Sequence, residues 1–119
     1  MDWKLELIVV PVSDIDRAKA FYEAQAGFTV LVDHSAGEDF RVVQLNPAGS
    51  ACAIALMRNL EAPGSLDGLH LVVEDIEAAR AQLVGNAVDI SEVSDMGGVK
   101  YAFLSDPDGN SWALQQVRR

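Results

Sequence analysis

The stretch PVSDIDRAKAFYEAQAGF, residues 11–28, is typical of a strand end followed by a short amphipathic helix. Asp14 is placed to cap this helix, because its side chain can accept a hydrogen bond from a free amide of the first turn. Apolar side chains then recur at helical spacing, and Gly27 suits the left-handed conformation that often ends a helix. The pattern returns as VVEDIEAARAQL at residues 72–83, with Asp75 in place of Asp14. The chain therefore contains two related units.

Runs of branched aliphatic residues around the two helices predict strands. They are expected at residues 3–12, 28–34, 40–45, 51–57, 69–73, 87–93, 99–105 and 111–117. A segment with proline and glycine, residues 61–67, separates module one (1–60) from module two (68–119). Each module is thus β-α-β-β-β, an internal repeat of about 60 residues. We expect an α+β fold in a single domain: two βαβββ modules whose paired, curved mixed sheets surround a cavity, with the helices on the outer faces.

Composition narrows the class of function. The chain has 119 residues, a net charge of −9 and one cysteine, Cys52. The negative charge argues against nucleic acid or an anionic membrane as a partner. A single cysteine excludes an internal disulfide and a multi-cysteine zinc site. Without a signal-like or membrane-spanning apolar run, a cytoplasmic protein is expected.

Two motifs resemble those of the vicinal oxygen chelate superfamily, which includes glyoxalase I, fosfomycin-resistance thiol transferases, bleomycin-binding proteins and extradiol dioxygenases. Residues 11–28 resemble its opening module, and LSDPDGNSWALQQV, residues 104–117, resembles its closing motif. The resemblance covers nearly the whole chain and implies paired βαβββ modules, often dimerised, so we expect a homodimer. In the metal-using members, ligands are a His seven residues before the helix-capping Asp and a Glu four residues after the turn Gly.

The positions that would hold a metal carry no ligand in this chain. Transferred residue by residue, the resemblance points to Leu7, Gly68, Ala53 and Ala113. None of these side chains offers a lone pair to a divalent ion. We therefore predict no metal and no cofactor. This departure argues against glyoxalase I chemistry, metal-dependent thiol transfer and ring-cleaving dioxygenation.

His70 is a polar group expected to face the cavity. In LHLVV, residues 69–73, the alternate residues Leu69 and Leu71 should pack under the helix, which directs His70 to the opposite face. In a pocket His70 could hydrogen-bond a ligand or act as acid or base, or it could make only a structural hydrogen bond. A metal role is the third alternative, although no carboxylate at a recognisable spacing would share the ion with His70. For Tyr101, in the strand at 99–105, the pattern does not decide which face reaches the cavity.

Strand alternation, with the geometry that the resemblance implies, predicts a mostly apolar cavity. The expected ligand-binding residues are Trp3, Leu5, Leu7, Ala53, Met57, His70, Ala113 and Gln115. Such a lining suits a flat or apolar small molecule that one or two hydrogen bonds orient. Alternatively, Trp3 and the aliphatic residues fill the core or a dimer interface.

The turn DPDGN, residues 106–110, is expected to have an architectural role. Pro107 presets one backbone torsion, and Gly109 permits a positive one. Asp106 and Asp108 can accept hydrogen bonds from amides of the turn itself. These carboxylates are therefore expected to hold the turn and not to bind a ligand.

Three hypotheses of function follow. The first is a metal-independent protein, bleomycin-resistance-like in architecture, that binds an apolar or aromatic small molecule. The second is a metal-free enzyme (an isomerase, lyase or cyclising catalyst) in which His70 is the acid or base and Gln115 or Tyr101 orients the substrate. The third is a regulatory or structural protein whose cavity is filled by its own side chains. Stoichiometric binding without turnover would favour the first hypothesis over the second.

Overall fold

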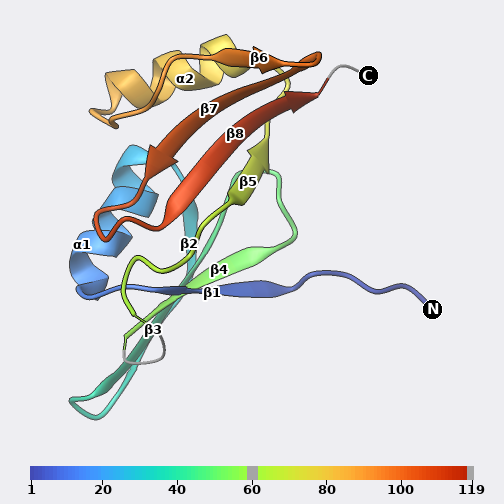
Figure 1. Cartoon of the computed structure of the whole chain (residues 1–119). Coiled ribbons are helices and arrows are strands. Elements are labelled where there is room, and N and C mark those ends of the chain that lie inside the picture. Colours follow the sequence, from blue (N-terminus) through green and yellow to red (C-terminus); the bar gives the residue numbers. More distant parts are fainter. Residues whose placement is uncertain (59–61, 118–119) are drawn as a thin grey trace.

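The computed structural model describes residues 1–58 and 62–117, and these form two four-stranded sheets with two α-helices and one π-helical turn (Figure 1). Module one contains β1 (Leu7–Pro11), α1 (Ile15–Ala20), the π-helical turn η1 (Phe21–Gln25), β2 (Thr29–Ala36), β3 (Phe40–Asn46) and β4 (Ala53–Met57). Module two contains β5 (Leu69–Val72), α2 (Ile76–Gly85), β6 (Ser94–Met96), β7 (Val99–Ser105) and β8 (Ser111–Val117). The predicted α+β fold of two modules is confirmed.

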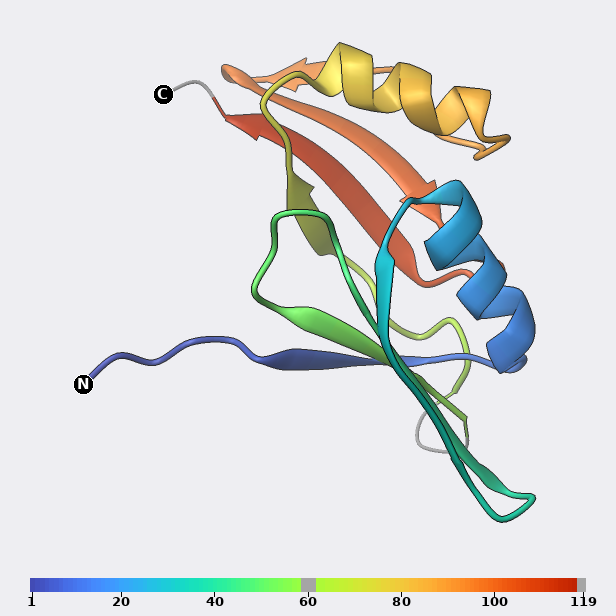
Figure 2. The ribbon, with the colours of Figure 1, turned by 180° about the vertical axis from the view of Figure 1, so that it is seen from behind.

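The two sheets have the same strand order. Sheet A runs β1-β4-β3-β2, and sheet B runs β5-β8-β7-β6. In each sheet the first strand of the module lies parallel to the last, so that Leu7 lies opposite Ala53 and His70 opposite Ala113. Over the described residues the sheets do not close into a barrel within one chain. The β2–β3 hairpin and the N-terminal residues extend away from the body of the molecule (Figures 1 and 2).

Both predicted helix caps are present. The Asp14 carboxylate accepts a hydrogen bond from the Arg17 amide at 3.1 Å, and the Asp75 carboxylate accepts one from the Ala78 amide at 3.0 Å. α1 is short and continues into η1, and Gly27 follows with a positive φ of 81°. An N-cap of this kind contributes about 1 kcal/mol to helix stability.

The hydrophobic core lies between the helices and one face of each sheet. α1 packs on β3 and β4, and α2 packs on β7 and β8. The buried side chains form one cluster that spans both modules. It is continuous at three aromatic rings, because the centroid of Trp112 lies 5.8 Å from that of Tyr22 and 5.9 Å from that of Phe28. The modules are therefore joined through their helix-side faces, and the opposite faces of the sheets are left open.

The predicted strand at residues 87–93 is wrong. Ile90 makes only an isolated bridge to Leu104, and the second strand of module two, β6, lies further along, between the strands expected at 87–93 and 99–105. The Ser91 hydroxyl accepts the hydrogen bond of the Phe103 amide at 2.8 Å, a bond that a backbone carbonyl would take in a regular ladder. A serine side chain thus competes with strand pairing here.

The first strand is shorter than predicted. Residues 3–6 lie outside β1, which begins at Leu7. Its partner β4 begins at Ala53, directly opposite Leu7, and the Ala53 amide donates to the Glu6 carbonyl at 3.0 Å. The residues before Glu6 therefore lie beyond the end of the partner strand. β7 and β8, by contrast, have the predicted bounds.

Candidate ligand-binding site

The open face of sheet B gathers the polar and aromatic residues that the sequence singled out. His70 is exposed between the half-buried Leu69 and Leu71, as the strand alternation predicted. Tyr101 lies on the same face, since its ring contacts that of His70. The structure therefore shows that Tyr101 is on the open face of sheet B, which the pattern of residues 99–105 did not decide.

His70, Tyr101, Phe103 and Gln115 form a compact group, which we call the sheet B aromatic cluster. Nδ1 of His70 lies 2.9 Å from Oε1 of Gln115. The His70 ring is nearly perpendicular to that of Tyr101, at 88°, with 6.2 Å between centroids. The Tyr101 and Phe103 rings stack at 10° and 6.0 Å. The cluster therefore offers aromatic surface next to a hydrogen-bonded imidazole.

The hollow in this cluster lies over Ala113. In the register of sheet B, His70 on β5 and Phe103 on β7 both lie opposite Ala113 on the strand between them. Two strand spacings separate the outer residues, about 10 Å. A methyl group thus stands between an imidazole and a phenyl ring, and this leaves room for a flat group.

A pocket of ≈ 690 Å³ opens at this hollow. Its lining comes from module two and from Asp67, the last residue of the segment before it: Asp67, Gly68, His70, Asp89, Ser91, Phe103, Leu104, Ser105, Asp106, Ser111, Trp112 and Ala113. Sequence reasoning missed the polar part of this lining. The signal was available, because Ser105 shares a strand face with Phe103, and Ser111 shares one with Ala113.

The other predicted binding residues lie on module one. Trp3 and Leu5 are on the N-terminal extension and are 88% and 74% exposed. Leu7 is on β1, opposite the buried Ala53, and Met57 ends β4. Within the described residues, none of these five lines the sheet B pocket. The structure therefore separates the predicted binding residues. His70, Ala113 and Gln115 lie on sheet B, where His70 and Ala113 line the pocket, and the other five lie on sheet A or on the extension before it.

The strand register shows which residues of module two correspond to the metal positions of module one. His70 faces Ala113 just as Leu7 faces Ala53. His70 precedes its helix cap Asp75 by five residues, whereas Leu7 precedes Asp14 by seven, so counting from the cap selects Gly68. Across residues 1–58 and 62–117 there is no group of three His, Cys, Asp or Glu side chains that could hold a metal ion.

In the DPDGN turn, Asp106 accepts hydrogen bonds from the turn's own amides as predicted, whereas the Asp108 carboxylate bonds to Ser13, outside the turn. Asp106 is 5% exposed, and its Oδ1 accepts from the amides of Asp108 at 3.0 Å and Asn110 at 2.9 Å. Its Oδ2 accepts from Nδ2 of Asn110 at 2.8 Å. The carboxylate is therefore saturated with protein donors, which supports an architectural role.

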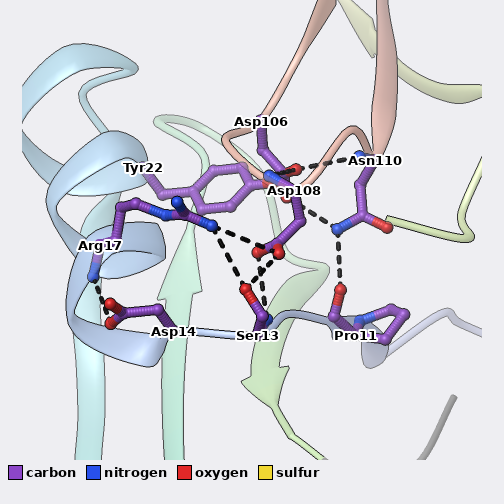
Figure 3. Close-up of polar contacts among 8 residues, drawn as sticks. All are labelled: Pro11, Ser13, Asp14, Arg17, Tyr22, Asp106, Asp108 and Asn110. Carbon is purple, nitrogen blue, oxygen red and sulfur yellow. Dashed lines mark hydrogen bonds and ion pairs between the residues drawn. The ribbon is translucent and has the colours of Figure 1, made fainter. Parts of the chain in front are cut away.

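The same turn also joins the two modules, which the sequence did not reveal (Figure 3). Oδ2 of Asp106 accepts from the Tyr22 hydroxyl of η1 at 2.7 Å, and that hydroxyl accepts from Nε1 of Trp112 at 2.9 Å. Asp108 accepts from the Ser13 hydroxyl at 2.5 Å and from the Ser13 amide at 3.1 Å. Burial, with the Asp106 charge beside it, raises the pKa of Tyr22 well above its usual range. Module two, which carries the site on sheet B, is therefore hydrogen-bonded to module one at this turn.

Comparison with known proteins places the fold in a family. Residues 4–114 match the family model described as Glyoxalase/Bleomycin resistance protein/Dioxygenase superfamily. The chain belongs to this superfamily. The match covers both modules, including β1, the DPDGN turn and most of β8. None of the helices in the described residues is long and apolar enough to cross a membrane.

Two solved structures and one further protein are similar to this chain. TnmS3, an antibiotic binding protein from Streptomyces sp. CB03234, is 34% identical, with 98% of each chain covered and a TM-score of 0.89. A glyoxalase/bleomycin resistance protein from the same Streptomyces is 36% identical over 95% of this chain and 100% of that one, with a TM-score of 0.83. The uncharacterized protein YetH of Bacillus subtilis (strain 168) is 25% identical over 92% of this chain and 94% of its own.

Proposed function

We propose that this protein binds an apolar or aromatic small molecule on the open face of sheet B, and that it does so without a metal ion. The observation that carries the proposal is the sheet B aromatic cluster beside a pocket of ≈ 690 Å³. Pockets of about 300–1,000 Å³ suit drug-sized ligands. The likeness to the antibiotic binding protein TnmS3 supports a ligand of antibiotic type.

Metal independence is proposed from the chemistry of the donor set. The positions that bind metal in other members of the superfamily hold Leu7, Ala53 and Ala113, with Gly68 or His70 as the fourth. Hydrocarbon side chains cannot coordinate an ion, and His70 alone gives one ligand. Affinity would then come from buried apolar area, ring stacking and a small number of hydrogen bonds.

We further propose a homodimer, because a single chain leaves large apolar side chains in water. Trp3 and Leu5 extend from module one, and Val72 and Phe103 are 62% and 46% exposed on sheet B. A twofold interface is self-complementary, so the apolar face of sheet A in one copy can cover sheet B of the other. Closing the pocket in this way would also remove the ligand from water.

The composition supports two further parts of this proposal. The chain's net charge of −9 disfavours nucleic acid and anionic membranes as partners. Its single cysteine is consistent with a cytoplasmic protein, as the sequence led us to expect. We propose that the chain forms a single domain and that the protein is cytoplasmic.

A metal-free enzyme is the second candidate function. His70 lines the pocket, and its hydrogen bond to Gln115 favours this function, since an oriented imidazole is a common acid or base. In this case Tyr101 or Gln115 would orient the substrate. Product formed from a bound compound, and lost in His70→Gln while binding persists, would support the enzyme over the binding protein.

Removal of the phenyl ring of Phe103 tests the binding proposal. Titration of a panel of planar aromatic compounds, followed by isothermal calorimetry, should identify compounds that bind at one site per chain without being consumed. Phe103→Ala should then weaken binding about tenfold or more, because it removes one side of the hollow over Ala113.

Val84→Ala is the control for this experiment. Val84 is 49% exposed, close to the 46% of Phe103, but it lies on α2, apart from the pocket lining and from both open sheet faces. We expect Val84→Ala to bind like the original protein. Equal losses in the two variants, or no loss in Phe103→Ala, would contradict the placement of the site.

A further inference from the structure

We propose that the ligand is an aromatic compound that carries a hydrogen-bond donor, a ring hydroxyl or a ring-attached amine, and that this donor binds Nε2 of His70. The inference rests on the proposed function and deepens it by naming the chemistry of the recognised group. It follows from the contacts of the His70 ring and from the position of the ring in the pocket.

The partner of Nδ1 decides which nitrogen of neutral His70 carries the proton. Nδ1 lies 2.9 Å from Oε1 of Gln115, and an amide oxygen can only accept a hydrogen bond. Nδ1 therefore donates, and Nε2 has the lone pair. In this tautomer the imidazole offers an acceptor at Nε2.

Nε2 is available to a ligand. Within residues 1–58 and 62–117, the hydrogen bond of His70 to a side chain is the one made by Nδ1. His70 lines the pocket and is exposed on β5. An acceptor in a pocket that apolar rings flank is a site where a ligand donor gains selectivity, because a mismatched group leaves the acceptor unsatisfied.

Three polar residues of the pocket wall, Asp67, Asp89 and Ser111, favour the same ligand chemistry. The Ser111 hydroxyl is already used, since it donates to the Asp67 carboxylate and accepts from the Gly68 amide at 3.1 Å. The carboxylates of Asp67 and Asp89, which also line the pocket, can only accept when ionised. The carboxylates of Asp67 and Asp89 thus offer a ligand further acceptors besides Nε2 of His70.

The aromatic part of the ligand follows from the row of residues across sheet B. His70, Ala113 and Phe103 lie side by side on three adjacent strands, and the Tyr101 ring stacks on that of Phe103. A flat ring over Ala113 would contact Phe103 on one side and reach His70 on the other. A substituent on the His70 side of such a ring would meet Nε2.

Three matched probes test the inference: 2-naphthol, 2-methoxynaphthalene and naphthalene, each titrated into the full-length protein with calorimetry. They share one flat two-ring body, and 2-naphthol alone carries a donor. We expect 2-naphthol to bind about 5- to 10-fold more tightly than 2-methoxynaphthalene, the gain of one hydrogen bond. His70→Phe should remove this difference while both probes still bind, because Phe keeps a ring but has no acceptor.

The outcomes separate the inference from the proposed function. Equal affinity of the original protein for 2-naphthol and 2-methoxynaphthalene would overturn the donor assignment and leave aromatic binding intact. The same would follow if His70→Phe kept the preference for 2-naphthol. Failure of all three probes to bind would overturn both proposals. His70 is on an open face, so an unchanged urea midpoint of His70→Phe is the check that the variant is folded.

Discussion

Replacing Asp106 with alanine is expected to lower the free energy of unfolding by about 3 to 5 kcal/mol. The buried carboxylate accepts hydrogen bonds from the Tyr22 hydroxyl, from Nδ2 of Asn110 and from two amides of its own turn. Each buried donor that loses its acceptor costs about 1 to 3 kcal/mol. The variant should therefore loosen the turn and the junction between the modules together. Urea unfolding, followed by fluorescence and circular dichroism, measures this loss.

Asp95→Ala provides a matched control for Asp106→Ala. Asp95 lies on β6, and its exposed side chain accepts one hydrogen bond, from the Gly98 amide of the turn before β7, at 2.9 Å. We expect it to cost about 1 kcal/mol or less, because water can replace a partner on the surface. An Asp106→Ala variant no less stable than Asp95→Ala would show that the buried network does not hold the modules together.

The double variant Trp3→Ser, Leu5→Ser is expected to convert a dimer into a monomer. Burial of a large apolar side chain contributes about 1.5 to 3 kcal/mol, and a twofold interface counts each residue twice. Even if half of this is realised, the dissociation constant of the dimer should rise at least about 100-fold. Size-exclusion chromatography with light scattering across a concentration series measures the subunit number.

The control for the dimer is Val84→Ser. Val84 is 49% exposed on the outer side of α2, away from both open sheet faces. It should leave the subunit number unchanged. A monomeric original protein at all concentrations would contradict the proposed dimer, and a double variant that dimerises like the original would show that another surface forms the interface.

Local patterns were enough to predict most of the fold. The capping aspartates and the repeat at residues 72–83 placed both helices, and the alternation in β5 gave the faces of Leu69 and His70. The prediction failed at residues 87–93, where a serine hydroxyl replaces a backbone acceptor. Side-chain competition of this kind leaves no mark in the hydrophobic pattern.

The contacts between the two modules could not be predicted from the sequence. The bond between Tyr22 and Asp106 joins residues 84 positions apart. Turn chemistry explains the local contacts of Asp106 but contains no information on a partner in the other module. The same limit applies to the strand of Tyr101, because alternation fixes two faces without saying which one the core covers.

The candidate site was predicted only in part, because local patterns do not contain the arrangement of the two sheets. His70, Gln115 and Tyr101 come together because β5, β8 and β7 are adjacent and in register, an order that the sequence analysis did not predict. The predicted residues of module one form a separate group, since a shared cavity depends on how the two sheets face each other. In one chain the two sheets each leave one face open, and we propose that a second copy of the chain covers these faces.

Native mass spectrometry of protein purified without added metal, before and after washing with a chelator, tests the central claim most directly. It reports bound metal, bound ligand and subunit number in one measurement. We predict a metal-free dimer that takes up one planar aromatic compound per chain and keeps its affinity after the chelator. A stoichiometric divalent ion that survives the wash, or aromatic binding that disappears when metal is removed, would contradict binding by shape and hydrogen bonds alone.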